Sequence, residues 1–112
     1  MTMDEFRALA LSLPEAAEGA HMGHADFRVG GKIFATLGYP DEGLGMVKLP
    51  VETQEMLAAA EPAVFRPVPG GWGRKGATYI QLAAADAATL QGALTAAWRN
   101  IAPKRLRDLS PP

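Results

Sequence analysis

Two adjacent glycines between two apolar-rich runs are the feature that most constrains the fold of this chain. The pair Gly30-Gly31 divides residues 24–37 into two short segments in which apolar residues predominate. A tight turn between antiparallel strands needs backbone with positive φ, which glycine adopts at no steric cost. The pattern therefore predicts a β-hairpin, and the remaining segments can be interpreted as helices and strands added to it.

The length of the hairpin loop determines which residues pair, because side chains alternate between the two faces of a strand. A loop of three residues ending at Lys32 pairs Val29 with Ile33 and Phe27 with Ala35, which keeps the apolar side chains on one face. A loop of two residues would pair Val29 with Lys32 and scatter those side chains over both faces. We therefore expect the three-residue loop.

Capping residues and apolar spacing predict the other elements. Thr2 and Glu5 have the spacing of a capping box, and Asp86 is suited to cap the last long helix. Residues 15–23 and the glycine-rich residues 70–76 are expected to be loops. In chain order we expect a helix over 2–13, strands over 24–29, 33–37 and 44–49, a helix over 50–62, a short edge strand over 64–69, a strand over 77–82, a helix from Asp86 to Ile101 and a helical turn over 104–109.

These elements predict an α+β fold with the order α-β-β-β-α-β-β-α. A sheet built from hairpins must be covered on its apolar face, so we expect a two-layer sandwich: an antiparallel sheet of about five strands with helices on one face. A chain of 112 residues is long enough to bury roughly two-thirds of its unfolded surface. We expect residues 1–112 to form a single domain.

The composition excludes several classes of protein. The chain has no cysteine, which excludes disulfides and thiolate chemistry. It has no apolar run of about 18 residues and begins with an acidic pair, Asp4-Glu5, so we expect neither a membrane span nor a signal peptide, and a cytoplasmic location. The Gly30-Gly31 pair lacks the spacing of a dinucleotide-binding or phosphate-binding loop, and we expect no cofactor.

A net charge of −1 conceals a strong asymmetry between the two halves of the chain. Residues 1–62 contain four basic and ten acidic residues, whereas residues 63–112 contain seven basic and two acidic residues. Such asymmetry suggests an anionic partner for the basic half, provided that the cations gather on one surface.

The glycine-flanked segment over residues 70–76 is the first candidate binding site. It carries Trp72, Arg74 and Lys75. Glycines allow a ligand to approach the backbone closely, the two cations suit phosphate, and an exposed indole can stack on a base. The alternative is structural, since a tryptophan in a small domain is usually in the core and glycines often form a turn.

A second basic cluster lies near the C-terminus. It consists of Arg99, Lys104, Arg105 and Arg107. These cations could contact phosphates. Cations at the end of a helix also interact favourably with the helix dipole, so part of the cluster needs no partner.

Two histidines and a carboxylate lie close together in the sequence. His21, His24 and Asp26 are of the right types to bind a metal, or the histidines could act as acids and bases with Glu15 or Glu18. No cysteine or further histidine completes a metal shell, and nothing identifies a nucleophile or an oxyanion donor. We therefore expect hydrogen bonds at this position, with no metal site and no catalytic residues.

Five segments of the chain carry a resemblance to a known family: residues 12–15, 21–37, 48–50, 71–76 and 96–106. Together, and in this order over nearly the whole chain, they resemble the MmcQ/YjbR family. This resemblance implies a compact α+β domain similar to a double-wing DNA-binding arrangement and to secretion-chaperone folds, without agreed catalytic residues.

The resulting expectation is a binding domain that is not an enzyme. We expect weak DNA binding through phosphate contacts by a basic surface from the C-terminal half, comprising Trp72, Arg74, Lys75, Arg99, Lys104, Arg105 and Arg107. The alternative is a protein-interaction module or a homodimer-forming domain that uses the hairpin or an edge strand. A third interpretation, a small enzyme or ligand-binding protein, would require a concave pocket enclosing His21 and His24.

Overall fold

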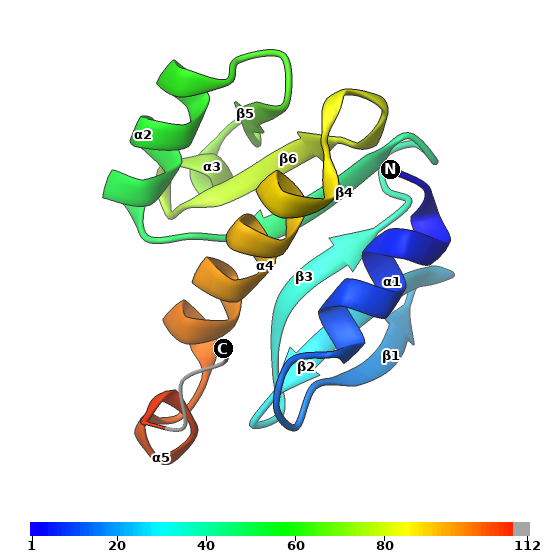
Figure 1. The fold of residues 1–112 in the computed structure, drawn as a ribbon, viewed down its shortest axis with the longest axis vertical. Helices are drawn as coiled ribbons and strands as arrows, with labels where there is room; N and C mark the ends of the chain where they lie inside the picture. The colour runs from blue at the N-terminus through cyan, green and yellow to red at the C-terminus, as the bar shows by residue number, and fades with distance from the viewer. Residues whose placement is uncertain (109–112) are drawn as a thin grey trace.

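Residues 1–108, which the computed structural model describes, form one six-stranded antiparallel sheet with the longer helices on one face (Figure 1). The strand order is β1-β2-β3-β4-β6-β5. The strands are β1 (Ala17–His21), β2 (His24–Val29), β3 (Lys32–Leu37), β4 (Leu44–Lys48), β5 (Phe65–Pro67) and β6 (Ala77–Gln81). The helices are α1 (Met3–Leu11), α2 (Val51–Ala60), α3 (Gly71–Arg74), the 3-10 helix η1 (Leu82–Ala84), α4 (Ala87–Ile101) and α5 (Lys104–Arg107).

The hydrophobic core lies between the sheet and the two helices that cross it. Helices α1 and α4 pack side by side on this face, whereas α2 lies beside the β5 edge (Figure 1). The largest buried side chains include Trp98 of α4, Phe6 of α1, and Phe27 and Phe34 of the hairpin. The indole Nε1 of Trp98 donates a hydrogen bond to the carbonyl oxygen of Pro14, which fixes α4 against the segment that follows α1. The expected α+β architecture is thus confirmed.

The sheet has one strand more than predicted. Strand β1 forms where a loop was expected, and it pairs with β2 from Ala17 opposite Arg28 to His21 opposite His24. Its residues are small or polar and mostly exposed, so they lack the apolar alternation that identifies a strand in a sequence. Backbone pairing at the sheet edge, which depends on β2 being in place, makes this segment a strand.

The hairpin has a two-residue turn and a β-bulge instead of the three-residue loop. Val29 pairs with Lys32, so the expected pairing of Val29 with Ile33 is wrong, whereas that of Phe27 with Ala35 is confirmed. The register shifts beside Phe27, where the extra residue on β3 is Phe34. The bulge keeps both Phe34 and Ala35 in the core, which reconciles the short turn with a single apolar face.

Both predicted helix caps are present. The Thr2 hydroxyl accepts a hydrogen bond from the Glu5 amide at 3.1 Å, and the Glu5 carboxylate accepts one from the Thr2 amide at 2.9 Å. The Asp86 carboxylate accepts from the Thr89 amide at 2.7 Å. Because a backbone N–H donates to each carboxylate, the pKa of Glu5 and the pKa of Asp86 both lie below their ordinary values. No helix among residues 1–108 is long and apolar enough to cross a lipid bilayer.

Candidate functional site

The face of the sheet opposite α1 and α4 carries a row of side chains that runs across the strands. Residues directly opposite each other in neighbouring strands point to the same face, so the pairing defines the row. In order across the sheet it consists of Gly19, Asp26, Thr36, Met46, Tyr79 and Arg66. This open face is where the sheet meets solvent.

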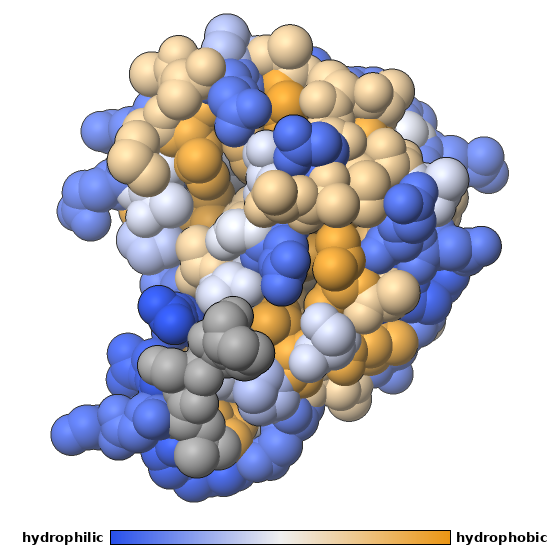
Figure 2. Space-filling view, in the orientation of Figure 1, coloured by the Kyte–Doolittle hydropathy of each residue, from blue (hydrophilic) through white to orange (hydrophobic). Residues whose placement is uncertain are grey.

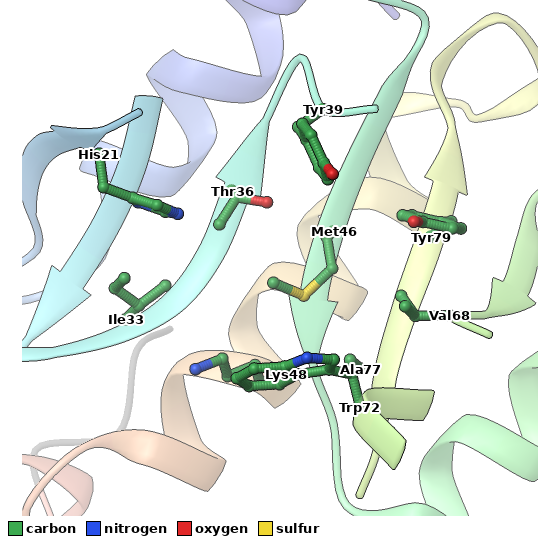
Figure 3. Close-up of a pocket in the computed structure, with 10 residues that line it drawn as sticks. All are labelled: His21, Ile33, Thr36, Tyr39, Met46, Lys48, Val68, Trp72, Ala77 and Tyr79. Carbon is green, nitrogen blue, oxygen red and sulfur yellow. The ribbon is translucent and has the colours of Figure 1, made fainter. Parts of the chain in front are cut away.

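A groove of about 250 Å³ lies along this row, and we call it the sheet groove (Figure 3). Seven of its ten lining residues are apolar or aromatic, and none is acidic. It crosses from β1 to α3, and the side chains that line it are His21, Ile33, Thr36, Tyr39, Met46, Lys48, Val68, Trp72, Ala77 and Tyr79. Its volume is below the roughly 300–1,000 Å³ that is usual for pockets of drug-sized ligands. The groove is therefore suited to flat groups laid against it rather than to a large enclosed molecule.

Exposed aromatic rings with cations beside them are the main chemical feature of the open face. The side chain of Trp72 is 68% exposed and that of Tyr39 is 56% exposed. The Lys48 Nζ lies 5.8 Å from the centre of the Trp72 ring, and the Arg66 guanidinium lies 5.4 Å from the Tyr79 ring. These are cation–π distances. Such a surface can stack planar groups and attract anions at the same time.

A buried glutamine holds α3, and with it Trp72, against the sheet. The Gln54 Nε2 donates hydrogen bonds to the carbonyl oxygens of Gly73, at 2.9 Å, and of Ala77, at 3.0 Å. A Cβ on Gly73 would collide with the carbonyl of Val68, and one on Gly76 would collide with the carbonyl of Leu49. These two glycines are therefore required by close backbone packing. The segment forms a short helix, not the flexible loop that was expected.

The carboxylate of Asp26 on β2 is completely buried and fully paired. Arg28 donates to it from Nε at 2.8 Å and from Nη2 at 3.1 Å, and the His21 Nδ1 lies 2.8 Å from its Oδ2. The hydrogen bond from Arg28 is the main reason why the pKa of Asp26 lies below its ordinary value, although burial opposes the shift. Asp26 also raises the pKa of Arg28. The carboxylate thus stays ionised at neutral pH, and its charge is balanced locally.

The two histidines have different surroundings. His21 lines the sheet groove, whereas the His24 ring packs against Tyr39 with 4.9 Å between ring centres. The groove therefore encloses one imidazole rather than two. Among residues 1–108, no group of three or more His, Cys, Asp or Glu side chains is arranged to hold a metal.

The two carboxylates considered as partners of these histidines are engaged elsewhere. Glu15 accepts hydrogen bonds from Arg105, and Glu18 accepts them from Arg7.

The seven predicted binding residues lie in two places. Trp72, Arg74 and Lys75 belong to α3 and its end, and of these only Trp72 lines the sheet groove. Arg74 lines a shallow depression beside α2. The other four lie at the end of α4 and on α5, where hydrophilic side chains gather on the helix-bearing face (Figure 2): Arg99, Lys104, Arg105 and Arg107.

Within the second group, the arginines differ in their partners. Arg105 is paired with Glu15, with its Nη1 3.2 Å from Oε2. Arg99 and Arg107 line a separate depression, which we call the basic hollow, and neither forms an ion pair with another residue of 1–108. The hollow is lined by Pro50, Thr53, Gly92, Thr95, Ala96, Arg99, Asn100 and Arg107.

Sequence reasoning missed most of the sheet groove. Met46 and Lys48 alternate with buried residues along β4, and Tyr79 does so along β6, so strand alternation could have placed all three on the solvent face. Nothing local indicates that these positions adjoin Trp72 or Tyr39. That proximity results from the order of the strands.

Comparisons with known proteins agree with this fold. A crystal structure of the Deinococcus radiodurans protein DR2400, which has a DUF419 domain, is similar with a TM-score of 0.76 and 20% sequence identity, covering 96% of this chain and 86% of that chain. At this identity the likeness shows the fold alone. None of the curated proteins compared with the chain matches it. The family model described as YjbR matches residues 11–100, as the resemblance in the sequence predicted. The chain therefore belongs to the YjbR family.

Proposed function

We propose that this protein is a binding domain without catalytic activity that takes a single strand of nucleic acid on the open face of its sheet. The observation that carries the proposal is the pairing of aromatic rings of the sheet groove with cations. Lys48, which also lines the groove, lies beside Trp72, and Arg66, on the neighbouring strand β5, lies beside Tyr79. Proteins bind single strands by stacking unpaired bases on aromatic side chains while nearby cations follow the phosphates. The proposal keeps nucleic acid as the partner and moves the main contact from the C-terminal cluster to the sheet.

The charges on the open face support this proposal. The six strands carry two carboxylates, Asp26 and Glu18. Asp26 is neutralised by Arg28. Glu18 points to the helix side and pairs with Arg7 of α1. Lys48 and Arg66 therefore act on a phosphate chain without a competing carboxylate among the groove residues. The overall acidity of the chain, with a pI near 6.1, resides mainly on helices and loops.

Single strands fit this face better than duplexes do. Stacking requires bases whose flat faces are accessible, and in a duplex those faces are covered by neighbouring base pairs. Duplex binding through phosphates alone usually requires a strongly basic domain. A net charge of −1 does not provide one. We therefore expect a single strand to bind more tightly than its own duplex.

Fluorescence anisotropy with a labelled dodecanucleotide of mixed sequence tests the proposal. At about 50 mM salt the single strand should bind saturably and more tightly than the duplex, and binding should weaken at about 200 mM salt. Trp72→Ala should weaken binding roughly 5- to 150-fold, which corresponds to the loss of one stacked base. Trp72→Phe should retain most of the affinity, since it keeps an aromatic face.

Met56→Ala is the matched control for Trp72→Ala. Met56 is an apolar side chain of α2 that is 61% exposed and lies outside the groove, so its removal should leave the affinity unchanged. The proposal is wrong if no oligonucleotide binds at low salt. It is also wrong if Trp72→Ala binds as the unaltered protein does.

A second candidate function is association through the β1 edge. Strand β1 ends the sheet and contains no proline, whereas the opposite edge strand, β5, ends at Pro67. A free edge without proline can pair with a strand of another molecule. Light scattering across a protein concentration series should then show a dimer that Ala20→Lys weakens. A monomer at every concentration would contradict homodimer formation.

A further inference from the structure

The basic hollow lies on the helix side of the sheet and the sheet groove lies on the open face, and both reach the end of β4. Lys48 lines the groove and Pro50 lines the hollow, and two residues of extended chain span about 7 Å. The side chain of Asn100, which also lines the hollow, donates a hydrogen bond to the Lys48 carbonyl oxygen at 3.0 Å. The end of α4 is therefore fixed to the end of β4, so the two depressions reach the same end of this strand from opposite faces of the sheet.

The chemistry of the hollow suits phosphate. Arg99 and Arg107 approach it from two different helices, and the side chains of Thr53 and Thr95 add hydroxyl groups that can donate hydrogen bonds. None of the eight lining residues is acidic. Arginine matches phosphate geometry with its fork of N–H donors. The position of Arg99 near the end of α4 also stabilises that helix, but Arg107 belongs to α5 and has no such role in α4.

We infer that the basic hollow is a phosphate-binding subsite for the part of a nucleic-acid strand that continues beyond Trp72 and Lys48. This inference rests on the proposed function. The groove crosses from β1 to β6, which is four inter-strand steps or about 19 Å. A strand of about four nucleotides therefore fills the groove, and only a longer strand that turns around the end of β4 to the helix side reaches the hollow.

The experiment compares a tetranucleotide with a dodecanucleotide of the same repeating sequence, both single-stranded. In the unaltered protein the dodecanucleotide should bind more tightly than the tetranucleotide. The double variant Arg99→Ala/Arg107→Ala should weaken dodecanucleotide binding roughly three- to tenfold and leave tetranucleotide binding unchanged. The slope of log K against log salt for the dodecanucleotide should become less steep by about 1.4, because two phosphate contacts are lost.

A matched control removes two charges from the same region. Lys104 and Arg105 are exposed residues of α5 that do not line the hollow, and Arg105 is already paired with Glu15. Lys104→Ala/Arg105→Ala should therefore leave the ratio of the two affinities nearly unchanged. Thermal unfolding of both double variants checks that each keeps its fold. Arg99→Lys/Arg107→Lys keeps the charge and should retain the salt slope.

The outcomes separate this inference from the proposed function. If both oligonucleotides bind and the arginine variant weakens them equally or not at all, the hollow is not a subsite and the open face remains the binding surface. The inference also fails if the lysine–arginine control lowers the length preference as much as the arginine variant does. If the tetranucleotide does not bind and the dodecanucleotide binding depends only on Arg99 and Arg107, the proposed function of the groove is overturned.

Discussion

Arg28 holds the buried carboxylate of Asp26 by two hydrogen bonds, 2.8 Å from Nε to Oδ1 and 3.1 Å from Nη2 to Oδ2. On the neighbouring strand β1, Gly19 lies opposite Asp26. A Cβ at this position would lie 2.9 Å from the Asp26 carboxylate and 3.3 Å from the Arg28 Nε. The edge strand therefore leaves room for the ion pair. This pairing removes an uncompensated negative charge from the open face.

Asp26→Asn should destabilise the protein at neutral pH more than in acid. Because Arg28 lowers the pKa of Asp26 in the folded protein, its ionisation stabilises the fold above the unfolded pKa of about 3.8, and that stabilisation is lost as pH falls through the lower, folded pKa. At pH 7 the substitution should reduce the free energy of unfolding by about 1–3 kcal/mol. Urea unfolding followed by circular dichroism, at about pH 7 and about pH 3, measures both values.

Asp4→Asn is the control for the effect of pH, because Asp4 is 94% exposed in its ion pair with Arg7. It should change stability little at either pH. An equal loss of stability for Asp26→Asn at both pH values would show that ionisation of Asp26 has no part in stabilising the fold.

Gly45→Ala and Gly92→Ala should shift stability in opposite directions. A Cβ on Gly45 would lie 2.5 Å from the Cε2 of the buried Phe6, so α1 must move away from β4, and we expect a loss of about 1–3 kcal/mol. A Cβ on Gly92, within α4, has no neighbour within 4 Å. Alanine there should add about 0.5–1 kcal/mol by favouring the helix. Thermal unfolding of the two variants measures both changes in stability. A loss of stability for Gly92→Ala would contradict the packing described for α4.

Gln54→Leu should release α3 without disturbing the main core. The carbonyl oxygens of Gly73 and Ala77 would each lose the hydrogen bond from Gln54 and keep one from a backbone N–H, at a total cost of about 1–3 kcal/mol for the two bonds. In a ¹H–¹⁵N spectrum the indole resonance of Trp72 should shift, while that of Trp98 should stay in place because it is bonded to Pro14.

The neighbouring substitution Glu55→Gln, at an exposed position of α2, should move neither indole resonance. If Gln54→Leu leaves Trp72 unchanged, Gln54 does not position α3. We further expect Gln54→Leu to weaken single-strand binding, because the Trp72 ring would no longer be held beside Lys48.

Local sequence determined the elements whose signals lie within a few residues. The capping box of Thr2 and Glu5, the cap at Asp86 and the apolar face of α4 act between neighbours along the chain, and each is present as predicted. The resemblance to the YjbR family was likewise sufficient to predict the fold class. It did not identify a binding surface.

The tertiary structure decided what depends on partners distant in sequence. Strand β1 has no strand signal of its own and forms only against β2, and the bulge at Phe34 exists because two core positions must be satisfied at once. The seven candidate binding residues, all from the basic half of the sequence, are separated into one group on α3 and its end and another at the end of α4 and on α5. Lys48, from the acidic half, lies beside Trp72. The physical reason is that strand order brings distant residues onto one face, and pairing between strands is a long-range interaction that no local pattern specifies.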